Sequence, residues 1–105
     1  MKYYHEENIL KKLILKFSDM SQKGTVVFFE KTALLDLILF FENDDHIEKA
    51  MEVCDFGIAQ YGSSMEFLFH KSRLLIELKE FDEAIGYLEK ALAYSPENFD
   101  LNLLQ

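Results

Sequence analysis

The chain has 105 residues, of which 50% are hydrophobic, enough for one folded domain and too few for two. One proline and four glycines cannot supply the tight turns of an all-β fold. The balance of 19 acidic against 11 basic residues, a net charge of −8, disfavours binding to nucleic acid or to an anionic membrane surface. No apolar run approaches the ~18 residues of a membrane span, and the single cysteine cannot form an internal disulfide, so we expect a cytoplasmic protein.

The first predicted helix spans Tyr4 to Met20. Ser21 to Gly24 then interrupts the pattern, and Thr25 to Phe29 is a β-prone run without alternation. A lone strand would have no partner, so we predict an extended linker, and residues 1–29 form an N-terminal helix and linker. The first helix is predicted because apolar residues recur at three- and four-residue steps and fall on one stripe: Ile9, Leu10, Leu13, Ile14, Phe17 and Met20.

Four further helices are predicted in the remainder of the chain, at residues 30–43, 46–61, 65–79 and 82–94. The breaks between them are short, and connections of that length make neighbouring helices antiparallel. The sequence therefore predicts two successive helical hairpins.

Local signals mark the ends of these helices. Asp45 with Glu48, and Ser63 with Glu66, have the spacing of capping boxes, in which two side chains satisfy the free amides of a helix start. Gly62 is expected to end the helix before it, because glycine readily adopts the backbone conformation of a helix C-terminus.

The two hairpins match each other in residue size when the sequence is shifted by 34 positions. Large residues fall on large ones and small on small, although only three positions are identical. A size pattern of this kind is a packing pattern, in which small residues let helix backbones approach. The matched pairs include Leu34 with Leu68, Phe41 with Leu75, Ile47 with Phe81, Ala50 with Ala84, Cys54 with Leu88, Gly57 with Ala91, and Ile58 with Leu92.

The stretch from Phe81 to Asn98, FDEAIGYLEKALAYSPEN, resembles the second helix and terminal proline of the tetratricopeptide repeat, a 34-residue helix-turn-helix unit. In the register set by its proline, the repeats are residues 31–64 and 65–98, and a third unit starts within 99–105. The resemblance implies an all-α stack of antiparallel helical hairpins, a TPR-like α-solenoid, over residues 30–105. Lys71 departs from the pattern, because the family usually has an aliphatic residue there.

No arrangement of residues in the sequence predicts catalysis. His5, His46 and His70 are far apart in the sequence, and no metal-ligand or phosphate-loop motif is present. Cys54 occupies a repeat core position, where a cysteine acts as a small hydrophobic residue. We therefore predict no enzyme activity, no metal site and no cofactor.

The resemblance implies that a ligand binds the concave surface formed by the first helix of each repeat. The acidic residues on this surface favour a basic or amphipathic protein segment as partner, with Phe69 as the anchor. We thus predict a protein-protein interaction module or scaffold. The expected partner-binding residues are Leu35, Leu39, Phe69, His70, Arg73 and Ile76, beside Asp36, Glu42 and Glu77.

Two other interpretations remain open from the sequence. The same apolar residues could instead bury the N-terminal helix or a second copy, or the chain could be the structural N-terminal cap of a longer solenoid whose binding surface lies beyond residue 105. The apolar residues of 99–105 open a third repeat without a second helix. We expect this C-terminal end to form a homodimer or to bind a neighbouring molecule.

Overall fold

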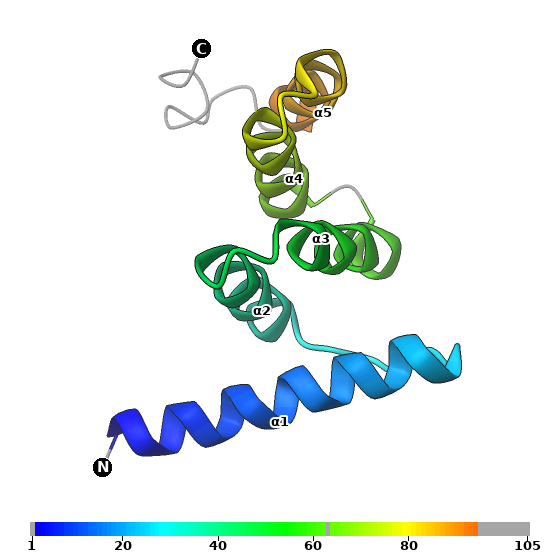
Figure 1. Ribbon diagram of the computed structural model, residues 1–105. Coiled ribbons are helices and arrows are strands. Elements are labelled where there is room, and N and C mark those ends of the chain that lie inside the picture. The colour runs from blue at the N-terminus through cyan, green and yellow to red at the C-terminus, as the bar shows by residue number, and fades with distance from the viewer. Residues whose placement is uncertain (1, 63, 95–105) are drawn as a thin grey trace.

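The computed structural model describes residues 2–62 and 64–94, and this part of the chain is all-helical (Figure 1). The five predicted helices are present, and the prediction of an all-α fold is confirmed. Pro96, the third repeat unit at 99–105 and Ser63 lie outside the described residues. The helices are α1 (Lys2–Lys23), α2 (Lys31–Asn43), α3 (Ile47–Tyr61), α4 (Met65–Glu77) and α5 (Phe81–Tyr94).

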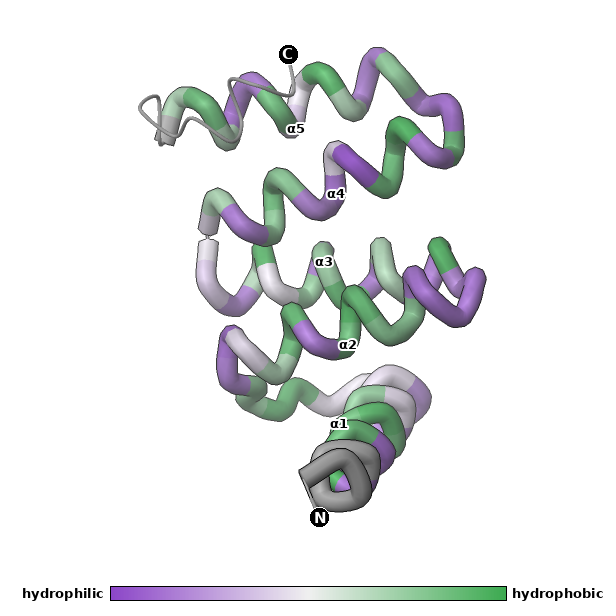
Figure 2. Tube along the Cα trace, turned by 90° about the vertical axis from the view of Figure 1, so that its left-hand side faces the viewer, coloured by the Kyte–Doolittle hydropathy of each residue, from purple (hydrophilic) through white to green (hydrophobic). Residues whose placement is uncertain are grey.

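The helices stack in chain order, and each packs against the next. In Figure 1, α2 and α4 lie on one side of the stack and α3 and α5 on the other. Helix α1 lies crosswise to the other four, because it runs across Figure 1 and is seen nearly end-on in Figure 2, where the others run across the view. The two hairpins, α2–α3 and α4–α5, are therefore joined by the packing of α3 on α4.

The offset of 34 residues recurs in the backbone of the two hairpins. One residue in the turn of each hairpin has a left-handed backbone conformation, with φ of 61° at Asp45 and 64° at Lys79. The next amide donates back into the first helix in both hairpins, from His46 to the Phe41 carbonyl at 2.8 Å and from Glu80 to the equivalent carbonyl of Leu75 at 2.9 Å. The size pattern in the sequence therefore corresponds to a repeated local structure.

The predicted helix ends are correct at Gly62 and wrong at Asp45. Gly62 follows α3 with φ of 71°, as a helix-ending glycine should. Asp45 lies in the left-handed turn, so His46 is the N-cap of α3, and no side chain caps this helix start. At α4 the N-cap is Ser64, whose hydroxyl contacts the carboxylate of Glu66 at 2.9 Å.

The linker between α1 and α2 is extended, as predicted, and its last aromatic side chain enters the core. Phe29 is 2% exposed, and its ring meets those of Phe17 and Phe56 edge-on at centroid distances of 5.8 and 5.6 Å. The amide of Gln60 binds both backbone groups of Phe29, accepting from its N–H at 3.2 Å and donating to its carbonyl. The linker thereby fastens the end of α1 to α3.

Gly57 sets the distance between the two hairpins. It lies in α3 against the ring of Phe67 in α4, and a Cβ atom at Gly57 would be 2.6 Å from two carbons of that ring. Phe67 is fully buried, so its ring has no open space into which it could move. Close approach of α3 and α4 therefore requires glycine at this position.

We expect Gly57→Ala to lower the free energy of unfolding by about 1–3 kcal/mol, because the added methyl group overpacks the α3–α4 interface. Gly86→Ala is the matched control, since Gly86 is also helical but has no atom within 4 Å of an added Cβ. The control should stabilise the fold by about 0.5–1 kcal/mol, the usual advantage of alanine over glycine in a helix. Urea unfolding measures both, and equal effects of the two substitutions would contradict the close approach.

Candidate functional site

A groove of ≈ 580 Å³ lies between α1 and α2. It arises because the two halves of α1 pack differently. Phe17 and Met20 in the second half are buried at 5% and 6% exposure, whereas Ile9 in the first half is 46% exposed. Apolar residues and two polar ones line the groove: Ile9, Leu10, Leu13, Asp36, Leu39, Phe40 and Asn43.

The polar residues give this groove an acidic character. Asp36 is exposed, and no basic side chain among the described residues forms an ion pair with it. Leu39, which is 46% exposed, lies one helical turn along the same helix. The groove therefore offers apolar contact next to an unneutralised carboxylate.

The six predicted partner-binding residues do not all face one surface. Leu39 lines the groove, and Ile76 is 49% exposed on α4. Leu35 packs instead against the buried core cluster to which α1, α2, α3 and α4 all contribute. Phe69, the predicted anchor, is partly buried against the cluster of Leu68 and Ala91 between α4 and α5.

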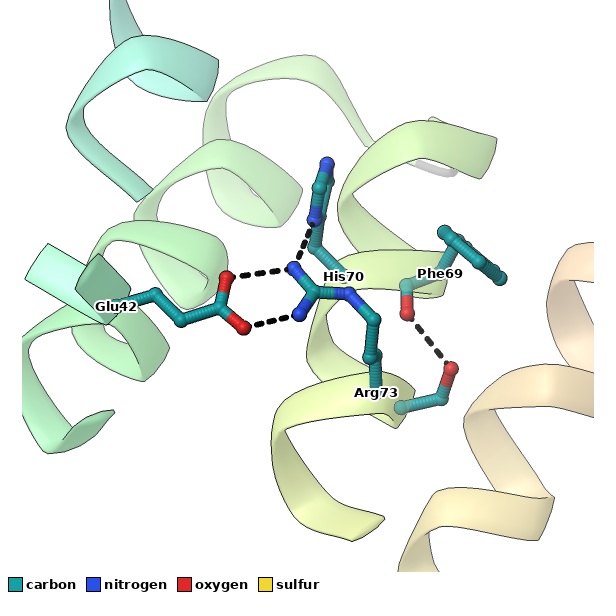
Figure 3. A network of polar contacts seen from close by, with 5 residues as sticks. Glu42, Phe69, His70 and Arg73 are labelled. Carbon is teal, nitrogen blue, oxygen red and sulfur yellow. Dashed lines mark hydrogen bonds and ion pairs between the residues drawn. The ribbon is translucent and has the colours of Figure 1, made fainter. Parts of the chain in front are cut away.

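His70 and Arg73 are held together with Glu42 in one polar network (Figure 3). The guanidinium of Arg73 binds both carboxylate oxygens of Glu42, with one contact of 2.8 Å, and also lies 2.9 Å from Nδ1 of His70. Because Glu42 is on α2 and Arg73 on α4, the pair joins the two hairpins. In Figure 3 the ring of Phe69 points away from this network.

The contacts around this network lower the pKa values of both Glu42 and His70. The hydrogen bond from Arg73 holds the pKa of Glu42 below its ordinary value. Burial lowers the pKa of His70, and the neighbouring charge of Arg73 lowers it further. His70 therefore favours the neutral form, in which Nδ1 accepts a hydrogen bond from the guanidinium.

Lys71, the residue that departs from the repeat pattern, connects three helices. It is 9% exposed, its amine binds the carboxylate of Asp55 on α3, and it lies 4.6 Å from the ring centroid of Tyr87 on α5. Burial alone would lower the pKa of Lys71, but the hydrogen bonds to Asp55 and Tyr87 outweigh it and raise the pKa. A lysine can replace an aliphatic residue here because its charge is paired and its stem is buried.

Two kinds of reactive group can be assessed among the described residues, namely the cysteine thiol and a metal-binding cluster. Burial raises the pKa of the Cys54 thiol to about 12, which keeps it protonated and unreactive. No group of three or more His, Cys, Asp or Glu side chains within residues 2–62 and 64–94 could hold a metal ion. Within the same residues, none of the helices has the length and apolarity needed to cross a membrane.

Comparison with known proteins identified no relative of this chain. No family model matches the chain, and no curated protein or solved structure gives a significant match.

Sequence reasoning missed the part of the groove that α1 contributes. Ile9, Leu10 and Leu13 were expected on an apolar helical stripe, and the stripe is real. The pattern of the stripe specifies which face of α1 is apolar. It does not specify which helical turns of that face the crosswise helix α2 will cover.

We expect the polar network to make stability fall in acid. The pKa of His70 is lowered from 6.5 in the fold, so the unfolded chain binds this proton more readily, and stability is lost as the pH falls below about 6.5. The pKa of Glu42 is lowered from 4.5, so its contribution is present above that value and is lost below it.

Urea unfolding at pH 7.5 and pH 5.5 on wild type and His70→Gln measures the histidine part. Wild type should lose more stability between these two pH values than the variant does, because Gln cannot take up a proton. The same loss in both proteins would contradict a neutral His70 in the fold.

Proposed function

We propose that this chain is a protein-protein interaction module, built on tetratricopeptide-like hairpins, that binds a partner segment in the groove between α1 and α2. It acts by binding rather than by catalysis. The observation that carries the proposal is this groove of ≈ 580 Å³, whose apolar residues Ile9 and Leu39 are each 46% exposed. The 34-residue recurrence of the hairpin turns supports the repeat class.

The groove has the composition of a peptide-binding surface. Its floor is apolar, which favours burial of leucine-like or aromatic side chains of a partner. Asp36 and the net charge of −8 favour a partner that also carries Lys or Arg. We therefore propose a basic, amphipathic protein segment as the ligand.

Two contacts favour this groove over the concave surface expected from the sequence alone. Arg73 is already paired with Glu42, so a ligand could use its charge only by breaking a bidentate ion pair. Phe69 packs toward α5, so it is less available as an anchor. Leu39 belongs to the groove as well as to the concave surface expected from the sequence, and its side chain is exposed.

A cytoplasmic location fits the same proposal. The one cysteine, Cys54, is a buried free thiol, and the fold of the described residues relies on packing and ion pairs. Proteins of reducing compartments are built in this way.

Selection of peptides from a random library tests the proposed groove. Peptides that bind wild type should be apolar with Lys or Arg, and Leu39→Glu should weaken their binding at least roughly tenfold, because it places a charge on the groove floor. Leu15→Glu is the matched control: Leu15 is an α1 leucine, 69% exposed, that does not line the groove. Both variants should keep the wild-type unfolding midpoint, as exposed substitutions usually do.

The proposed function fails if no selected peptide distinguishes Leu39→Glu from Leu15→Glu. Binding that is lost equally in both variants would likewise contradict the groove, because Leu15 lies outside it.

A further inference from the structure

Helix α5 lies at the far end of the stack from α1 (Figure 1), and its outer face carries exposed apolar side chains. Phe81 and Ile85, one helical turn apart, are each 54% exposed. The residues 34 positions earlier, Ile47 and Met51 in α3, are instead partly buried. They pack against the large core cluster that contains Leu74 of α4. The difference arises because α4 packs on α3, whereas no described helix follows α5.

The contact between α3 and α4 shows how such a face is covered. Lys71 of α4 binds the carboxylate of Asp55, and Leu78 just after α4 lines the same small cavity as Ile47. Residue numbers rise along α4 as they fall along α3, so the two helices run antiparallel. Leu74, between these two points on α4, is fully buried in the core cluster.

Helix α5 presents the equivalents of the α3 positions in the same order. Glu89 corresponds to Asp55, and Phe81 corresponds to Ile47. Phe81, Ile85 and Glu89 are spaced four residues apart, so they follow one stripe of the helix, and all three are exposed. Glu89 forms no ion pair with any residue that the structure describes.

We propose that the outer face of α5 docks an amphipathic helix of a protein partner, antiparallel to α5, with the pattern Lys-x-x-Leu-x-x-x-Leu. The lysine of this helix pairs with Glu89, and its two leucines cover Ile85 and Phe81. The pattern is the one that α4 uses on α3, namely Lys71, Leu74 and Leu78. This surface is separate from the groove of the proposed function, and neither proposal depends on the other.

The probe is a synthetic peptide with the sequence of residues 65–78, in which Leu68 and Phe69 are replaced by Gln. These two side chains pack toward α5 within the fold, so their replacement reduces the face that α4 turns to α5 and keeps Lys71, Leu74 and Leu78. Fluorescence anisotropy with the full chain should show saturable binding. Ile85→Glu should weaken it at least roughly tenfold, the loss usual for a central interface contact.

Charge reversal tests the register. Glu89→Lys should weaken binding of the probe, and a probe carrying Lys71→Glu should regain affinity for Glu89→Lys while binding wild type poorly. Leu15→Glu, on α1 and outside both the groove and the face of α5, is the control and should leave binding of the probe unchanged. Thermal unfolding checks that each variant remains folded.

Three outcomes would overturn the proposal. The first is no saturable binding of the probe to wild type. The second is binding that does not distinguish Ile85→Glu from Leu15→Glu, or that charge reversal does not restore. The third is a concentration-dependent dimer in light scattering that Ile85→Glu abolishes, because a second copy of this chain would then occupy the face.

Discussion

The close approach of Gly57 and Phe67 is the contact on which the arrangement of the two hairpins depends. Each hairpin is defined locally by its short turn, whereas the α3–α4 interface is the main packing contact that sets how one hairpin sits on the other. A residue with a side chain at Gly57 would push α4 outward by its Cβ. That shift would also separate Lys71 from Asp55 and Arg73 from Glu42, since both ion pairs join α4 to the first hairpin.

Those two ion pairs add what apolar packing lacks, which is a preferred register. Leucine and phenylalanine side chains can slide past one another at little cost, whereas a partly buried charge that loses its partner is strongly penalised. The Glu42 side chain is 15% exposed and the Lys71 side chain 11%, so one member of each pair is shielded enough for this penalty to act. Aromatic packing around Phe29 performs the corresponding task for α1, because Gln60 holds the backbone that carries the ring.

The sequence predicted the features that depend on neighbouring residues in the chain. It did not predict the contacts between residues that are far apart in the chain. The helices, the linker and the 34-residue offset follow from local periodicity. The capping role of Asp45 was wrong because the turn needs a left-handed residue there, and aspartate tolerates that conformation. The pairing of Arg73 with Glu42 and the crosswise position of α1 are set by tertiary packing, so no local pattern contains them.

The distribution of charge links the core to the proposed ligands. Arg73, the chain's one arginine, and Lys71 are both bound to carboxylates inside the fold, and Lys31 pairs with Glu66. Three basic groups thus serve to join helices, while Asp36 on α2 and Glu89 on α5 form no ion pair among the described residues. Each of these ion pairs cancels one basic and one acidic charge, so the net charge of −8 is carried by the groups outside them, and a partner meets a negative field. A basic helix gains most where that field meets exposed apolar surface, which is the case beside Leu39 and beside Ile85.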